Sequence, residues 1–420
     1  MAYSRYRPTR TEALPASSPR QAPLALSMMS VHRDERFPIG ASISVDALTD
    51  SPYEVLDQLR AEEPVSWVPA TGAWFVTRRD LAIEAMVDAV RYTVDDDRFT
   101  TARVLGTSML NLDGPEHERH RRAFVKPFRP KFVREELEAR IVDRAARLVA
   151  ASLEGPRELR TGVAGPLAVD TILDVLGLHE VAVDDVLSWY GAFGTAITAL
   201  TVGEEVPDEI HSTLAQLYDY VGGAMGRDDA GLITQLVDEQ VLTAEEIPAA
   251  VAVVMFGAIE TSEGMTTNAF WHLFTNPEVL DRLRADRSLL PHVIDESLRL
   301  EPAAAWLDRY TTEDVVLGGT EIPASELVTI NLLAANRDPE VFDEPATFNI
   351  DRPNRTQHVT WAQGPHTCLG LHVAKAETAA AITALLDAEA ADGTRFEIDK
   401  TQSSPPTGLI FRKPESLVLG

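Results

Sequence analysis

The chain has 420 residues, of which 45% are hydrophobic and 25% are charged, so it has the composition of a globular protein that can bury a sizeable core. Its 65 acidic residues against 38 basic ones give a net charge of −27, which favours solubility and argues against a nucleic-acid-binding surface. The chain holds one cysteine, which excludes a secreted scaffold built on internal disulfides.

The N-terminal 40 residues are rich in Arg, Ser and Pro and lack the apolar core of a secretory signal. We expect residues 1–40 to form a disordered arm and residues 41–420 to form a single domain. The longest apolar run, 249–259, is shorter than the roughly 18 residues needed to cross a bilayer. The sequence therefore predicts no membrane anchor and a cytoplasmic location.

Apolar residues at helical spacing predict helices over 52–63 and 79–89, with a hairpin over 65–77 between them. Residues 91–114 lose this periodicity, and such a long irregular stretch in a compact chain usually borders a binding site. Further helices are predicted over 115–153 (broken near Pro127 and Pro130), 164–178, 183–202, 209–225, 243–274, 277–286 and 288–300.

The helix predicted over 243–274 begins with Thr243 and Glu246, which have the spacing of a capping box. Extended segments are few and are predicted over 315–322, 327–331 and 408–412. No alternation of strands and helices indicates a doubly wound sheet. The predicted class is therefore mainly α with a small β portion, in which strands from both ends of the chain pair.

A single cysteine is by default a small buried hydrophobe, but the surroundings of Cys368 point to another role. Gly364 and Pro365 permit a tight turn before it, and a helical stretch starts at Leu371. The free N–H groups and the dipole of a helix N-terminus favour a thiolate. An iron bound by such a thiolate gains electron density that favours O–O cleavage, and Gly370 allows a flat macrocycle to approach closely.

This stretch resembles the cysteine loop of cytochromes P450, Phe-Gly-x-Gly-x-His-x-Cys-x-Gly. Trp361 and Ala362 stand in place of the usual Phe and first Gly, and the other fixed positions match. The resemblance implies that Cys368 is the axial ligand of haem b. It also implies that the cofactor is contacted by Trp361, Gly364, His366 and Gly370.

Two further segments resemble motifs of the same family in the same order. Glu296 and Arg299 form its Glu-x-x-Arg pair on one helix face, 72 residues before the cysteine (368 − 296). An exposed ion pair is the simpler reading of such a spacing by itself. The resemblance implies instead that Arg352, in Phe-Asn-Ile-Asp-Arg-Pro, completes a buried structural cluster with them.

Residues 257–262, Gly-Ala-Ile-Glu-Thr-Ser, are similar to the oxygen-activating segment of the family. The resemblance implies that Gly257 and Ala258 lie beside the oxygen site, where Ala258 replaces a usual Gly and narrows the groove. Thr261 would hydrogen-bond the oxygen being activated, and Glu260 would belong to a proton relay. A side-chain hydroxyl at Thr261 can also bond a backbone carbonyl and open the helix locally to admit water.

Cations in the same order as in the family's motifs imply, through the resemblance, how the haem propionates would be held. Residues 113–122 resemble a family segment that supplies His117 and Arg121, which lie four residues apart on one helix face. Arg309 and His366 would be further propionate partners. Each of these residues alone is more simply a solvated surface charge.

A basic stretch without any acid runs from residue 119 to 134, in spite of the strongly acidic chain. A solvated helix face is one explanation. The other is a docking surface, centred on Arg122, Lys126 and Arg129, for an acidic ferredoxin or flavodoxin-type electron donor steered by charge.

The resemblance spans roughly residues 46–419 and implies the triangular single-domain P450 fold, with haem between the long central helix and the helix after Cys368. It implies a monooxygenase that uses dioxygen and two electrons to oxidise an apolar small molecule in bacterial specialised metabolism. A haem-thiolate enzyme that couples, desaturates or isomerises without oxygen insertion is an alternative, as is a non-catalytic haem sensor. Glu260 and Thr261 argue against the sensor.

By family mapping the substrate pocket would be lined by 98–112, 187–219, 255–261, 303–307 and 407–409, with Trp306 its one bulky aromatic.

Overall fold

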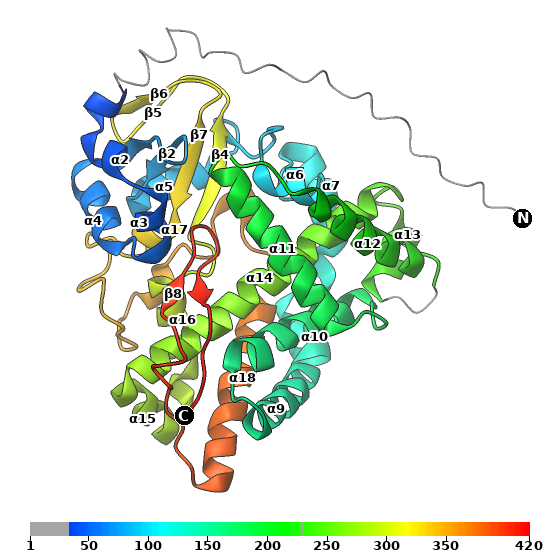
Figure 1. Cartoon of the computed structure of the whole chain (residues 1–420). Coiled ribbons are helices and arrows are strands. Elements are labelled where there is room, and N and C mark those ends of the chain that lie inside the picture. Colours follow the sequence, from blue (N-terminus) through cyan, green and yellow to red (C-terminus); the bar gives the residue numbers. More distant parts are fainter. Residues whose placement is uncertain (1–32, 228–230) are drawn as a thin grey trace, which may run out of the picture.

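The computed structural model describes residues 33–227 and 231–420 (Figure 1). Most of the predicted N-terminal arm therefore lies outside the described residues. Its predicted end at residue 40 is wrong, because residues 33–36 are already helical and α2 spans Pro38–Ser42. The Arg33 guanidinium pairs with the Glu326 carboxylate at 2.8 Å and lies over the Trp67 ring, so this segment is fixed to the sheet region.

Helices make up most of the described chain, as the apolar periodicity predicts. The N-terminal helices are α3 (Val45–Asp50), α4 (Tyr53–Glu62), α5 (Arg79–Val87), α6 (Thr100–Leu105), α7 (Gly114–Phe128), α8 (Pro130–Phe132) and α9 (Glu138–Glu154). The middle helices are α10 (Gly165–Leu176), α11 (Val183–Thr201), α12 (Asp208–Ala224), α13 (Leu232–Glu239) and α14 (Glu246–Thr275). The last ones are α15 (Pro277–Ala285), α16 (Leu290–Leu300), α17 (Leu332–Ala335) and α18 (Leu371–Asp392).

One five-stranded sheet stands at one end of the molecule and has the order β1-β2-β7-β4-β3. Its strands are β1 (Val65–Val68), β2 (Ala73–Val76), β7 (Leu327–Asn331), β4 (Trp306–Thr311) and β3 (Tyr92–Thr93). β2 and β7 run parallel, with Trp74 opposite Val328, so strands from distant parts of the chain pair as predicted. Two small hairpins are formed by β5 (Val315–Leu317) with β6 (Thr320–Ile322) and by β8 (Pro406–Thr407) with β9 (Lys413–Pro414).

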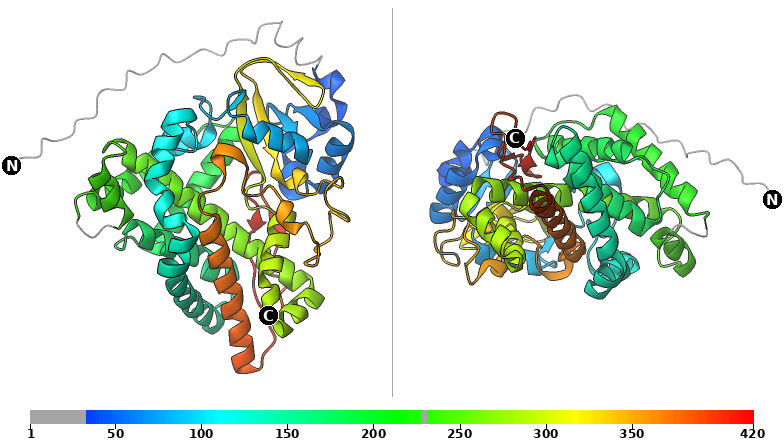
Figure 2. Two further views of the ribbon diagram at one scale, coloured as in Figure 1. Left: turned by 180° about the vertical axis from the view of Figure 1, so that it is seen from behind. Right: turned by 90° about the horizontal axis from the view of Figure 1, so that it is seen from below.

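The helix α14 crosses the middle of the molecule, and α18 passes behind it in Figure 1 and is seen in full from the back in Figure 2. α14 is apolar on nearly all sides because α10, α12 and α18 pack around it. The sheet with α2 to α5 and α17 occupies one side, and α6, α7 and α9 to α13 lie on the opposite side (Figure 1). The main hydrophobic core therefore surrounds α14, and a second core lies between the sheet and α5.

Three predictions of local structure need correction. Residues 408–412 are not a strand but the tip of the β8–β9 hairpin, where Gly408 has φ +121°. The irregular stretch 91–114 contains β3 and α6. Strand β4 was not predicted, because two adjacent charges, Asp308 and Arg309, break the apolar alternation of an interior strand.

α14 starts at Glu246 rather than at residue 243, yet half of the predicted capping box forms. The Glu246 carboxylate accepts a hydrogen bond from the Thr243 backbone N–H at 2.8 Å. Among the described residues, α14 and the segment Gly364–Asp392 are long and apolar enough to cross a membrane by length and composition alone. In α14, 72% of that apolar window is buried inside the protein, as in the core helix of a packed fold.

Candidate active site

The loop before α18 places Cys368 in front of a helix N-terminus. The 3-10 turn Gly364–His366 leads into it, and the Cys368 N–H donates to the Trp361 carbonyl at 2.8 Å. Gly364 has φ +77°, and a Cβ there would lie 2.9 Å from the Met86 carbonyl oxygen, so only glycine fits. Ala362 also has a positive φ, +56°, at the position where the family pattern has its first glycine.

The pKa of the Cys368 thiol is raised above its ordinary value, and local donors oppose this only in part. Burial raises the pKa of Cys368, whereas the N–H groups of Gly370 and Leu371 and the charge of Arg121 lower it. Cys368 is nevertheless partly accessible. A bound metal cation would favour the thiolate outright in such a setting.

The central helix presents a small open face in the middle of its buried length. Gly257 is exposed and Ala258 and Thr261 are partly exposed, although Ile259 and Glu260 between them are buried. A Cβ at Gly257 would meet nothing within 4 Å, and the same holds for Gly370. Space for a flat group therefore exists beside both segments.

The Thr261 hydroxyl donates to the Gly257 carbonyl at 2.5 Å, which is the side-chain to backbone bond expected for this residue. The helix nevertheless stays α-helical from Glu246 to Thr275, so the predicted local opening is absent from α14. Glu260 is buried, and its carboxylate binds Lys413 Nζ at 2.7 Å. Lys413 also binds Glu263, which pairs with Arg160.

Two of the four predicted propionate partners carry buried polar atoms without a partner. His117 Nε2 and Arg309 Nη2 are both inaccessible and unpaired, and each side chain is 3% exposed. Burial lowers the pKa of His117 to about 4 and that of Arg309 to about 10. Unpaired buried donors of this kind are costly unless a ligand satisfies them. A carboxylate of a bound group would do so, and the residues present therefore fit haem.

The other two predicted partners are already engaged. His366 Nε2 lies 2.8 Å from the Asp113 carboxylate, and its ring lies against that of His117 with centroids 4.4 Å apart. Arg121 Nη2 donates to the carbonyl of Thr367 at 2.6 Å, next to Cys368. Asp113 was not singled out from the sequence, although it stands in the quoted motif. Its hydrogen bonds to His366, Thr93 and Val94 help to lower its pKa to about 2, against burial.

Trp361 packs beside Met265, Ala303 and Ala374, and Lys375 Nζ lies over its ring at 5.9 Å. Within the described part of the chain, no hydrogen bond joins its indole to the Cys368 sulfur. Trp361 binds Cys368 through its backbone carbonyl, which accepts the Cys368 N–H at 2.8 Å.

Glu296, Arg299 and Arg352 come together in a fully buried cluster. The Glu296 carboxylate accepts from Arg299 at 2.7 Å and from Arg352 at 3.2 Å. The Arg299 guanidinium also donates to the carbonyls of Asn336, Pro345 and Thr347, which fixes the segment 336–347 to α16. The arrangement holds the chain that leads to the cysteine loop.

Some cations of the basic stretch 119–134 are bound to other residues, whereas others form no ion pair with the described residues. Arg122, Lys126 and Arg129 are exposed, and none forms an ion pair with a described residue. They line a surface hollow of about 430 Å³ together with Glu118, Arg121, Val125, Gln235 and Glu239. Because Arg121 lines this hollow and also binds the carbonyl of Thr367, the hollow lies next to the cysteine loop.

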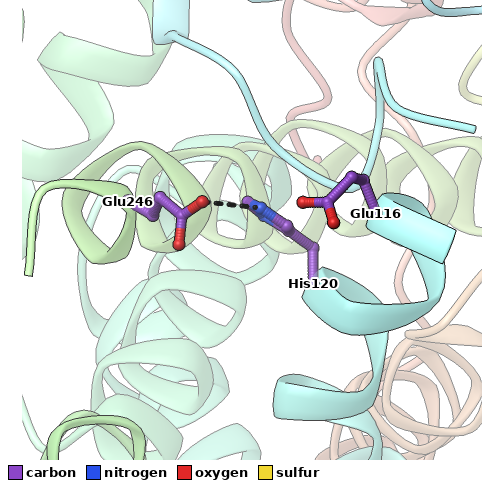
Figure 3. Close-up of side chains that lie close together, drawn as sticks. All are labelled: Glu116, His120 and Glu246. Atoms are coloured by element: carbon purple, nitrogen blue, oxygen red, sulfur yellow. Dashed lines mark ion pairs between the residues drawn. The ribbon is translucent and has the colours of Figure 1, made fainter. Parts of the chain in front are cut away.

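A second candidate, Glu116, His120 and Glu246, has the ligand types of a metal site (Figure 3). Their ligand atoms all lie within 4.8 Å of one another. The Arg119 guanidinium, however, contacts Glu116 at 2.7 Å, Glu246 at 2.6 Å and His120 Nε2 at 3.2 Å. A cation already occupies the centre of the group, so we assign it a structural role between α7 and α14.

Comparisons with known proteins agree with this geometry. A family model described as Cytochrome P450 matches residues 226–407. The chain is 31% identical over 383 residues to mycinamicin IV hydroxylase/epoxidase of Micromonospora griseorubida, covering 86% of this chain and 93% of that one. It is 28% identical over 405 residues to pulcherriminic acid synthase of Bacillus subtilis, covering 90% and 97% of the two chains. The solved structure of the monooxygenase TamI bound to tirandamycin C superposes with a TM-score of 0.78 at 27% identity, covering 90% of this chain and 98% of that one.

Proposed function

Because the chain belongs to the cytochrome P450 family and is thus a haem-thiolate monooxygenase, we propose that Cys368 is the residue that holds its haem iron. Cys368 is the only cysteine of the chain. Cys368 stands before the N-terminus of α18 and is partly accessible, and the buried donors of His117 and Arg309 lack a partner; these observations carry the proposal. Haem b, when bound, supplies the iron at which dioxygen is activated.

The chain's own residues would orient the cofactor and control protons. His117 Nε2 and Arg309 Nη2 would donate to propionates, which satisfies donors that are otherwise buried without a partner. Thr261 would offer its hydroxyl on the open face of α14. Glu260 would take part in proton supply, with Lys413 holding its carboxylate in place. Glu296, Arg299 and Arg352 would act structurally.

We infer that the substrate is a mainly apolar small molecule of specialised metabolism, oxidised in the cytoplasm. Relatives named for mycinamicin IV and tirandamycin C support this class. A surface hollow of about 520 Å³ between α6 and the α11–α12 connection, lined in part by Arg103, Leu200 and Val206, is a suitable entrance. Neither a non-catalytic sensor nor an enzyme without oxygen insertion is favoured by the relatives.

The electrons come from a redox partner, and we propose an acidic ferredoxin or flavodoxin-type protein. The exposed cations Arg122, Lys126 and Arg129 support this choice, because they are unpaired in a chain of net charge −27 and lie beside the cysteine loop.

The central test is the carbon monoxide complex of the reduced protein. It should show the red-shifted Soret band of a thiolate-bound haem, and Cys368→Ser should lose that band. Thr367→Ser, at the preceding residue, is the matched control and should retain it. Absence of the band in the parent protein, or its survival in Cys368→Ser, would contradict the assignment.

A further inference from the structure

Strand β4 carries an acidic side chain that the haem-thiolate chemistry does not use. Trp306, Asp308 and Tyr310 alternate onto one face of β4, since successive side chains of a strand point to opposite sides. Arg309, with its propionate role, belongs to the other face. Tyr310 packs on Phe99 at the start of α6, so the face of Asp308 looks toward the segment 98–112 that should border the substrate.

Asp308 lies in an interior strand between β7 and β3 yet remains partly accessible. Burial raises the pKa of its carboxyl group to about 6, against the hydrogen bond from Thr329 and the charge of Arg309. Its strand neighbours Arg309 and Tyr310 are buried, so the accessible part of Asp308 indicates open space beside this strand. Arg103 of α6, the helix that follows Phe99, lines the 520 Å³ hollow.

The Asp308 carboxylate has no cationic partner. The Thr329 hydroxyl donates to it at 2.8 Å, and no Lys, Arg or His of the described chain comes within 4.0 Å. The neighbouring Arg309 turns Nη1 to the Asp308 backbone carbonyl instead. The carboxylate thus has one side-chain hydrogen bond and no ion pair, and a buried acid with so few partners is costly. Such costs are typical of functional sites.

A second unsatisfied polar group lies on the same face. Trp306 is 4% exposed, and its indole Nε1–H has no hydrogen-bond partner. Two residues along a strand correspond to about 6.6 Å, so a single small ligand can reach both side chains. One offers an anionic acceptor, and the other offers a neutral donor beside an aromatic face that attracts cations.

We propose that Asp308 anchors an ammonium group of the substrate and that the Trp306 indole donates to a neighbouring oxygen of the same molecule. The inference rests on the proposed function and narrows its substrate class to an apolar small molecule bearing one basic amine. Binding would give the buried carboxylate its missing counter-ion and the indole its missing acceptor.

The test uses two series of imidazoles, which coordinate the haem iron of the holoenzyme through the ring and so anchor both series alike. One series carries an ω-aminoalkyl chain of three to six carbons at N1 and the other the matching n-alkyl chain. Dissociation constants are read from the Soret shift at high ionic strength, where steering by the net charge is screened. We expect the amine to bind about tenfold tighter or better than the alkyl compound at one chain length, since a hydrogen bond to a charged group contributes roughly 1.5–3 kcal/mol.

Asp308→Asn, which keeps the shape and an acceptor for Thr329, should bring that ratio to about one. Asp308→Glu should retain a preference at a changed chain length, and Glu313→Gln, an exposed acid just beyond β4, should leave the ratio unchanged. The proposal is overturned if the parent enzyme prefers the amine at no chain length, or if Asp308→Asn keeps the preference. Loss of haem from Asp308→Asn with an intact preference would also overturn it and assign Asp308 to the cofactor. If no imidazole shifts a Soret band in the parent protein, the proposed haem function fails instead.

Discussion

A single residue of the cysteine loop is held in a conformation that its type disfavours. Ala362 has φ +56°, a region that costs an L-residue with a Cβ roughly 1–2 kcal/mol. Ala362→Gly should therefore raise the free energy of unfolding, by about 1 kcal/mol at most, because glycine also loses more entropy on folding. The measurement is thermal unfolding of the holoprotein.

The control for that prediction is Ala146→Gly, at an exposed site inside α9 where the helix has ordinary dihedrals. It should lower stability by about 1 kcal/mol. If Ala362→Gly destabilises the protein as much as the control does, the strain at residue 362 is not relieved by glycine.

Thr261 is the residue whose hydroxyl lies on the open face of α14. Thr261→Ala should release several-fold more peroxide per electron consumed, because proton delivery to activated oxygen then lacks its hydroxyl. Thr267→Ala is matched, since the Thr267 hydroxyl makes the same bond to the Glu263 carbonyl in a fully buried part of the helix. Equal peroxide release from both variants would argue against the assigned role.

His272 should make stability depend on pH. Burial lowers its pKa to about 3 from an ordinary value of 6.5, and Ser297 and Phe348 hold the ring. Because the unfolded chain binds the proton more tightly, the contribution of neutral His272 to the free energy of unfolding is fully present above about pH 6.5. This contribution falls as the pH drops toward 3, by about 2 kcal/mol at pH 5. His272→Gln should flatten this slope between pH 7.5 and 5 in thermal unfolding. The exposed His211→Gln should leave it unchanged.

At the scale of elements, a buried charge cluster joins α16 to the segment that leads to the cysteine loop. Glu296→Gln leaves Arg299 and Arg352 buried without their counter-ion and should cost about 3–5 kcal/mol. Asp351→Asn is the control, because its partner Arg282 and the carboxylate are both well exposed, and it should cost less than about 1 kcal/mol. Similar losses of thermal stability in the two variants would count against a cluster that is essential to the fold.

Some helices, strands and site residues could be predicted from the sequence and others could not. Helices such as α4, α11 and α14 followed from apolar spacing, because each buries one side or all of its surface in the core. β4 could not be found, since the adjacent charges Asp308 and Arg309 interrupt the apolar alternation expected of an interior strand. The motif residues around Cys368 were recognisable because they are close in sequence. Lys413 was not, because 153 residues separate it from Glu260.

For the whole molecule, the distribution of charge governs electron transfer. The exposed cations of α7 stand out against a net charge of −27. Replacing Arg122 and Lys126 by Gln should slow reduction by an acidic ferredoxin several-fold at low salt, and the difference should shrink as salt rises. Stopped-flow reduction under carbon monoxide measures this. A double variant of Arg147 and Lys400, which are exposed and lie outside this stretch, should reduce at the parent rate at every salt concentration.

The parallel pairing of β2 with β7 has a consequence for synthesis in the cell. Trp74 of β2 can pair with Val328 of β7 only after a further 254 residues have been synthesised (328 − 74). At the usual 5–20 residues per second, ribosomal synthesis alone separates the two strands by about 13–50 s. During that time β1 and β2 form at best an isolated hairpin, which is marginally stable in water. The nascent chain thus has an exposed strand edge for most of its translation, and the yield of folded enzyme should depend on chaperones that cover such edges.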